Sequence, residues 1–236
     1  MNNRLEQVLS ILFFIIVFGF YTVISNYSRQ EYVAGEYASR LLLSKDGSVC
    51  KAFFSPDDKI THLLIDVIAA EQEEILVAIF TLTDQGIAQA LVDAQARGVK
   101  VELVSDPGYI KPGTYSKIDF LQEHNVPIYI FNAAACKPKG YCLMHNKFAL
   151  FAKNIKDKAL IWTGSFNWTK SANITNQENV VVLDSPDIIE SFRKQFSILK
   201  QRSKAPCAGI VQEEIRDQLS PEQTWWQELI HRLGFA

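Results

Sequence analysis

The chain has 236 residues, of which 48% are hydrophobic and 21% are charged. This is the composition of an ordinary folded protein, and it excludes a disordered or collagen-like chain. The formal net charge is −2, so bulk positive charge does not hold this protein on nucleic acid. Four cysteines are too few for a disulfide-dense scaffold, and a domain of this size folds without one.

An apolar run without a charged residue lies near the N-terminus. Residues 8–24 read VLSILFFIIVFGFYTVI, which at about 1.5 Å per residue is at the short end of a membrane-spanning helix. A buried core helix and a cleaved signal peptide are the alternatives, but the run has no amphipathic face and no A-x-A-like site follows it. We therefore expect a single-pass membrane anchor within residues 1–30 and a spacer over residues 31–48. Positive residues flank both ends, which leaves the orientation open.

Residues 49–200 carry the patterns of an α/β domain. Ser55-Pro56-Asp57-Asp58 has the features of a helix start, with a capping serine, a proline and two acids. Apolar and alternating runs predict strands, and apolar residues at helical spacing predict helices between them. The strands are expected at 75–80, 99–104 and 128–131, and the helices at 85–97 and 117–124. This β-α-β-α-β order predicts a mixed, largely parallel sheet with helices on both faces.

The pattern changes in the second half of the chain. Paired strands are expected at 143–151 and 159–162, then a strand at 180–183 and an amphipathic helix at 186–199. Residues 201–236 predict a linker and a C-terminal amphipathic helix that begins at a capping box and carries Trp225 and Trp226. Three alternatives are open for this expected helix: it docks on its own domain, it docks on a partner subunit, or it lies at a membrane surface.

Polar residues suited to a phosphodiester gather in three short segments. His145 and Lys147 are two residues apart in MHNKFALF, so they project from one face of an expected strand. Ser165 and Asn167 follow the next strand, and Glu178 precedes the one after. Imidazole, ammonium, hydroxyl, amide and one carboxylate form a site for a phosphodiester without a metal cluster. Each residue alone is better explained as an ordinary strand-edge or turn residue, so the inference rests on the whole set.

In this order and spacing, the set resembles the phospholipase D superfamily, in its short branch with one H-x-K copy per chain. That branch includes bacterial endonucleases and mitochondrial cardiolipin hydrolases. The resemblance runs from about Phe53 to Leu199 and is strongest over residues 144–180. It implies a phosphoric diester hydrolase, of phospholipase D type, that needs neither a metal nor a cofactor.

The resemblance also implies a role for each polar residue. His145 would attack phosphorus and form a covalent phosphohistidine. Because each chain carries one such histidine, a second copy from a homodimer partner would protonate the leaving alcohol. The charge on the non-bridging oxygens would be stabilised by Lys147, Ser165 and Asn167.

Acidic residues complete the resemblance, with one departure. Glu178 would accept a hydrogen bond from His145, and Asp106 matches a recurrent acid of these proteins. The family motif usually reads H-x-K-x4-D, but Ala152 stands at the aspartate position. Either Asp157 replaces this acid from another backbone position or the acid is dispensable. An inactive, membrane-tethered scaffold is the remaining alternative.

Two substrate classes fit the sequence. The expected anchor and the near-neutral charge favour a phospholipid cleaved on its head-group side. A nuclease with the same site is the alternative, in which a groove between two subunits binds phosphates through Lys111, Lys137, Lys139 and Lys170. The side of the membrane separates the two, and we expect the catalytic domain outside the cytoplasm.

The cysteine pair Cys136 and Cys142 bears on this compartment. The two residues bracket a short segment next to the candidate site. They would close a small disulfide loop in an oxidising compartment, and free buried thiols are the equal alternative.

Overall fold

The computed structural model describes residues 34–109, 115–132 and 142–204. The expected anchor, Cys136 and the expected C-terminal helix lie outside these ranges. None of the helices within the described ranges is long and apolar enough to cross a membrane.

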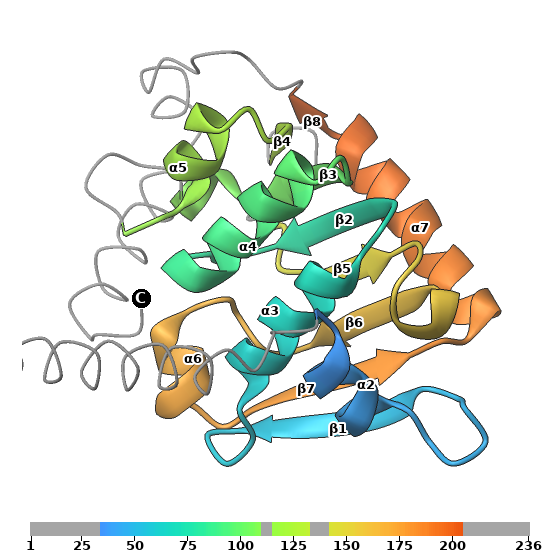
Figure 1. Ribbon diagram of the computed structural model, residues 1–236. Helices are drawn as coiled ribbons and strands as arrows, with labels where there is room; N and C mark the ends of the chain where they lie inside the picture. The colour runs from blue at the N-terminus through green and yellow to red at the C-terminus, as the bar shows by residue number, and fades with distance from the viewer. Residues whose placement is uncertain (1–33, 110–114, 133–141, 205–236) are drawn as a thin grey trace, which may run out of the picture. The chain divides into compact units, whose positions relative to one another are not determined.

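Within the described ranges, eight strands form one sheet in the order β1-β7-β6-β5-β2-β3-β4-β8 (Figure 1). Their bounds, in chain order, are β1 Cys50–Ser55, β2 Glu74–Ile79, β3 Lys100–Ser105, β4 Ile128–Phe131, β5 Lys147–Phe151, β6 Leu160–Gly164, β7 Glu178–Leu183 and β8 Ser203–Lys204. Sequence patterns predict β2 to β7 to within a few residues, and they miss the edge strands β1 and β8.

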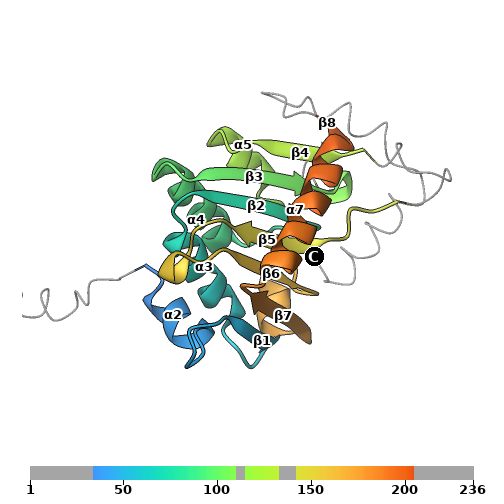
Figure 2. The same ribbon diagram turned by 90° about the vertical axis from the view of Figure 1, so that its right-hand side faces the viewer.

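Helices cover both faces of this sheet (Figure 2). They are α2 Glu36–Leu42, α3 Ile60–Ala70, α4 Gln85–Ala96, α5 Ile118–Glu123, α6 Lys170–Ile174 and α7 Pro186–Gln201. Side chains of α2 to α5 build the larger core on one face, and α7 packs across the other. Strand β2 contributes Val77 to the first core and Ala78 to the second, which explains its continuous apolar sequence.

The expectation of a largely parallel sheet is wrong. Only the pairs β2–β3 and β3–β4 are parallel, and the other pairs of this sheet are antiparallel. A parallel neighbour requires a crossover connection, which α4 and α5 supply between β2, β3 and β4. Strands β5, β6 and β7 follow one another along the sheet through connections that reverse the chain direction, so each pairs antiparallel with the next.

The predicted helix start at residues 55–58 is also wrong, because α3 begins at Ile60. The hydroxyl of Ser55 donates a hydrogen bond to the carbonyl oxygen of Asn176 at 3.1 Å, so it serves a contact between distant segments instead of a helix cap. The carboxylate of Asp58 accepts a hydrogen bond from the N–H of Phe54 at 2.7 Å and closes the turn after β1. These residues therefore end a strand.

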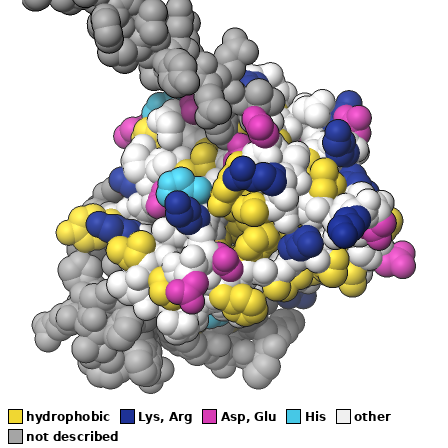
Figure 3. All heavy atoms as spheres, turned by 60° about the horizontal axis from the view of Figure 1, so that its bottom comes forward, with side chains coloured by type: hydrophobic (Ala, Val, Ile, Leu, Met, Phe, Trp, Pro, Cys, Tyr) yellow, Lys and Arg dark blue, Asp and Glu magenta, His cyan; other side chains and the backbone are white. Residues whose placement is uncertain are grey.

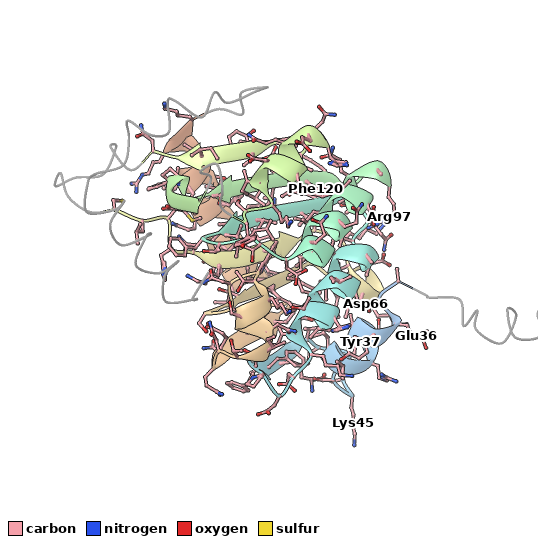
Figure 4. The ribbon with its side chains drawn as sticks, turned by 90° about the vertical axis from the view of Figure 1, so that its left-hand side faces the viewer. Glu36, Tyr37, Lys45, Asp66, Arg97 and Phe120 are labelled. Carbon is pink, nitrogen blue, oxygen red and sulfur yellow. The ribbon has the colours of Figure 1, made fainter. Side chains whose placement is uncertain are left out.

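The folded unit begins earlier than the expected boundary at residue 49. Helix α2 lies within the expected spacer, and its Ala38 is fully buried. Asp66 lies on α3, close to α2 (Figure 4). Its buried carboxylate accepts hydrogen bonds from the N–H groups of Gly35, at 3.0 Å, and Ala38, at 2.7 Å. Gly35 has a positive φ of 82°, and a Cβ there would lie 2.7 Å from the Cβ of Ala70. Helix α2 is thus tied to α3 and belongs to the folded domain.

Candidate active site

The six residues that the sequence singles out lie at one end of the strands, along the side of the sheet where several strand ends meet. We call this side the candidate edge. Strands β2, β3 and β6 end at this edge, whereas β5 and β7 begin there. The antiparallel pairing of β5 with β2 and β6, and of β6 with β7, brings these ends side by side. The residues at or next to these ends are Asp106, His145, Lys147, Ser165, Asn167 and Glu178.

The side chains of His145 and Lys147 are in contact. Strand β5 begins at Lys147, so His145 lies just before the strand and is exposed, whereas Lys147 is only 8% exposed. The Nζ atom of Lys147 lies 3.1 Å from Nδ1 and 3.3 Å from Nε2 of the imidazole. It also donates a hydrogen bond to the carbonyl oxygen of His145 at 2.9 Å. The expected pairing of imidazole and ammonium is therefore present in the fold.

Burial lowers the pKa of both groups, and the charge of Lys147 lowers that of His145 further. Loss of solvent, and then the charge of Lys147, lower the pKa of His145 below its usual 6.5. Loss of solvent lowers the pKa of Lys147 to about 8, although the negative charge of Glu178 opposes this change. At neutral pH the site therefore holds a neutral imidazole, which is the nucleophilic form, beside an ammonium ion.

Asp106 holds the backbone that leads to His145. Its carboxylate is 1% exposed and accepts hydrogen bonds from the N–H groups of Gly108 and Met144, each at 2.8 Å. Burial raises its pKa to about 6, although the two N–H groups stabilise the charged form. Because Met144 directly precedes His145, this acid acts on the imidazole through the backbone.

The Ser165 hydroxyl lies at the start of the loop after β6. Its Oγ accepts hydrogen bonds from the backbone N–H of Asn179, at 3.0 Å, and from the side-chain amide of Asn179, at 3.3 Å. Its own proton therefore stays available for a further acceptor. A Cβ at Gly164 would collide with the carbonyl oxygen of Asn179, so the close approach of β6 and β7 requires glycine here. Sequence patterns do not identify Asn179.

Asn167 lies in the same loop and has unused hydrogen-bonding capacity. Its Oδ1 atom is buried without a hydrogen-bond partner within the described part of the chain. The loop itself is held against the segment after β2, because the N–H of Trp168 donates to the carbonyl oxygen of Thr81 at 3.0 Å. The amide is thus supported by a backbone that is fixed on the side of β2.

The expected hydrogen bond between Glu178 and His145 is not formed. The Oε1 atom of Glu178 instead accepts a hydrogen bond from the side-chain amide of Asn176 at 3.2 Å. The imidazole lies against Lys147 and the ring of Phe80. Glu178 acts on the site through its charge, which raises the pKa of Lys147.

Phe80 belongs to the site although the sequence indicates a core residue. It ends the apolar run 75–80, whose pattern predicts only a buried strand. Its ring contacts His145 and lies under the ammonium of Lys147. The one feature of the sequence that could have identified Phe80 as a site residue is its position, as an aromatic residue, at the end of that strand.

A buried carboxylate, that of Glu71, holds the segment next to Ala152. Asp157, the expected replacement, is 74% exposed and has one ion pair, with Lys153 at 3.8 Å. Glu71 is 2% exposed, and its carboxylate accepts hydrogen bonds from the N–H of Lys153, at 2.8 Å, and from the side-chain amide of Asn154, at 3.0 Å. The turn between α3 and β2 thus provides the carboxylate that holds the segment after β5.

Two further findings concern cysteines and metals. Cys142 is disulfide-bonded. Its expected partner, Cys136, lies outside the described residues. Within the described ranges, no group of three or more histidine, cysteine, aspartate or glutamate side chains is placed to hold a metal ion.

The chain is similar to known proteins over the region that carries this site. The family described as "Cardiolipin synthase, PLD-like domain" matches residues 64–200. A phospholipase D of Rickettsia bellii is 31% identical over 150 residues, which are 64% of this chain and 68% of the relative. A mitochondrial cardiolipin hydrolase of Chlamydomonas reinhardtii is 31% identical over 135 residues, which are 57% of this chain and 55% of the relative.

Solved structures share the fold. NucT from Helicobacter pylori aligns with a TM-score of 0.59 at 24% identity, covering 66% of this chain and 98% of that one. Nuc from Salmonella typhimurium, a phospholipase D family member, aligns with a TM-score of 0.55 at 24% identity, covering 66% of this chain and 96% of that one.

Proposed function

The chain belongs to the family of phospholipase D-like domains, and we propose that it hydrolyses the phosphodiester bond on the head-group side of phospholipids. The contact of the Lys147 ammonium with the His145 imidazole, at 3.1 Å, carries this proposal. It joins an uncharged nucleophile to a cation that attracts a phosphate. The relatives named phospholipase D and cardiolipin hydrolase support a phospholipid as the substrate.

In the proposed reaction, a ring nitrogen of His145 forms a bond to phosphorus while the bond from phosphorus to the alcohol oxygen breaks. The partner subunit's His145, which enters the reaction as the protonated imidazolium, transfers a proton to that oxygen, and the alcohol leaves. The same imidazole then takes a proton from a water molecule that attacks the phosphohistidine. The bond from phosphorus to nitrogen breaks, which frees the phosphate product and restores both imidazoles.

Residues around the nucleophile would stabilise the charge that develops on the phosphate oxygens. Lys147 supplies a fixed positive charge, which Glu178 helps to maintain. Ser165 supplies a hydroxyl proton that its contacts with Asn179 leave unused. Asn167 supplies an amide on the supported loop after β6. Asp106 would contribute indirectly, through the backbone before His145.

A second imidazole would come from another copy of the chain. Within the described part of the chain, the other histidines are His62 on α3 and His124 at the end of α5. His124 lies against Phe120, with Nδ1 at 2.8 Å from its carbonyl oxygen, and neither histidine follows a strand at the candidate edge. A homodimer in which two copies of His145 face each other meets the need for a general acid.

A nuclease with the same site is the alternative function. The face of the domain over β1 mixes basic, acidic and hydrophobic side chains among the described residues that it displays (Figure 3). A long polyanion binds best to a continuous basic surface, and the described residues on this face do not form one (Figure 3). Of the four lysines expected to bind phosphates, only Lys170 lies within the described residues, where it is exposed.

Membrane attachment remains part of the proposal. The apolar run at residues 8–24 would anchor the chain as a single-pass protein, with the catalytic domain outside the cytoplasm. Such an anchor would keep the site near a bilayer that contains its substrate.

The full-length chain in detergent micelles tests the function directly. It is assayed with chelator present against labelled phosphatidylcholine, labelled cardiolipin, and labelled single-stranded and duplex DNA. We expect release of the head group and no cleavage of DNA, with a loss of activity in His145→Ala. Cleavage of DNA alone would refute the phospholipase function and support the nuclease function. If neither substrate is hydrolysed in a way that depends on His145, both functions are refuted.

A further inference from the structure

Phe80 touches both of the groups that carry the proposed chemistry. Its ring centroid lies 4.3 Å from that of His145, with the two ring planes at 60°. The Nζ atom of Lys147 lies 5.0 Å from the centroid of the same ring. The register explains this position, because Ile79 at the end of β2 pairs with Lys147 and Phe80 is the next residue.

The aromatic ring solves an electrostatic problem of this site. A buried ammonium needs a partner, but a carboxylate bonded directly to it would cancel the charge that a phosphate requires. The face of an aromatic ring attracts a cation through its quadrupole and carries no net charge. Among the described residues, the hydrogen-bond partners of the Lys147 ammonium are the imidazole and carbonyl oxygen of His145, and both are uncharged at neutral pH.

The same ring restricts the imidazole. An edge-to-face arrangement of two rings has a preferred geometry, and Phe80 itself is only 8% exposed, so its position is set by the surrounding side chains. His145 is exposed and precedes the strand, so the ring supplies a support that strand pairing does not.

We propose that Phe80 is a positioning residue, which holds the Lys147 ammonium and the His145 imidazole together while leaving the charge of the ammonium available to the phosphate. This inference rests on the proposed function of His145 and Lys147. It predicts that the aromatic face of Phe80 matters more than its apolar bulk.

Three variants distinguish the effect of the aromatic face of Phe80 from the effect of its apolar bulk. Phe80→Leu keeps an apolar side chain and removes the ring, whereas Phe80→Tyr keeps the ring. Phe151→Leu is the matched control, because Phe151 is 1% exposed and ends β5 at the edge away from the site. Thermal unfolding of all three proteins measures the loss of packing.

We expect Phe80→Leu to lower kcat/KM about tenfold, with Phe80→Tyr close to wild type, as the size of cation–π contacts implies. Phe151→Leu should keep the wild-type kcat/KM although it loses comparable stability. In an NMR titration of labelled lysine, the pKa of Lys147 should fall by roughly half a unit to one unit in Phe80→Leu, because the cation loses its aromatic partner. Phe151→Leu should leave that pKa unchanged.

Equal effects of Phe80→Leu and Phe151→Leu on kcat/KM and on the Lys147 titration would overturn the inference. The titration needs no substrate, so it decides the role of Phe80 even if the wild-type chain hydrolyses no phosphodiester. That latter result would instead overturn the proposed function.

Discussion

The buried carboxylate of Asp106 accepts a hydrogen bond from the backbone N–H of Met144 at 2.8 Å, which connects the end of β3 to the residue before His145. This contact gives the acid a role that its position in the sequence did not reveal. It holds the start of the β5 segment while the second oxygen holds the turn at Gly108.

Asp106→Asn should therefore lower kcat/KM by about ten- to a hundredfold while the protein stays folded. Asparagine offers one accepting oxygen, so one of the two N–H groups loses its partner. Steady-state kinetics and thermal unfolding measure the effect. A folded Asp106→Asn protein with wild-type kcat/KM would show that the tether is not needed.

Stability should fall as pH rises through the titration of Asp106. The folded pKa of about 6 lies above the usual aspartate pKa of 3.8, so the folded state binds more protons between these values. Protonation of Asp106 therefore contributes about 3 kcal/mol to the free energy of unfolding. This contribution is fully present below about pH 4 and is lost above about pH 6. Urea unfolding at a series of pH values should show this fall in the wild type and a smaller one in Asp106→Asn. Parallel curves would contradict the assignment.

The pH dependence of activity should follow Lys147 on its basic side. The Lys147 pKa of about 8 means that the ammonium loses its proton above that pH, and phosphate binding weakens. We expect kcat/KM to fall above about pH 8, and Lys147→Arg, although less active, to keep its activity to higher pH because the guanidinium stays charged. Rates measured from pH 5 to 10 test this. A wild-type rate that is constant to pH 9.5 would exclude Lys147 as the required cation.

Removing the ammonium should make the fold more stable. Burial lowers the pKa of Lys147 from 10.5 to about 8, so the unfolded state binds more protons between these values. At neutral pH the charged side chain therefore costs stability, and Lys147→Met should raise the free energy of unfolding by about 1 to 3 kcal/mol. The gain should shrink above about pH 8, because the folded wild type then loses the buried charge. Chemical denaturation at pH 7 and pH 10 measures both, and a destabilised Lys147→Met protein at pH 7 would contradict the prediction.

Glu71→Ala should destabilise the protein by about 2 to 4 kcal/mol, because it leaves the N–H of Lys153 and the amide of Asn154 without their partner. Asp157→Ala is the control and should change stability by less than about 0.5 kcal/mol, since that side chain is exposed. If Glu71 replaces the motif acid, adding Ala152→Asp to Glu71→Ala should recover part of the loss. Equal losses for Glu71→Ala and Asp157→Ala would argue against this exchange.

The proposed homodimer makes a prediction about mixed subunits. Wild-type chains exchanged with an excess of His145→Ala chains should lose activity, because each mixed dimer has one imidazole for a reaction that uses two. Analytical ultracentrifugation confirms assembly in the mixed sample. Full activity per chain in a sample shown to be monomeric would exclude the shared site, and His62 or His124 would then be the candidate acids.

The sequence alone predicts the elements whose signals are local. Helix α4 matches its apolar spacing, and Gly98, with a φ of 94°, follows it as the expected stop. Strand β4 has the expected bounds, 128–131. The order of histidine, lysine, serine, asparagine and glutamate also indicates the family, and the match over residues 64–200 confirms it.

The strand directions and the partners of charged side chains depend on contacts between distant segments. The hydroxyl of Ser55 donates its hydrogen bond to the carbonyl oxygen of Asn176, which is 121 positions away, and does not cap a helix. Glu71 accepts a hydrogen bond from the N–H of Lys153, which is 82 positions away in the chain. Local sequence does not encode which residues meet across a sheet, because register follows from the packing of all strands together.

The sequence by itself therefore determined which chemical groups the protein brings to a phosphodiester, since these follow from residue types and their spacing. Only the tertiary structure decided how these groups are held. It placed His145 against Lys147 and paired Glu178 with Asn176. It also placed Phe80 against the ammonium and tied Asp106 to the backbone before the imidazole. The physical reason is that burial and hydrogen-bond geometry arise from neighbours in space, and most of these neighbours are remote in the chain.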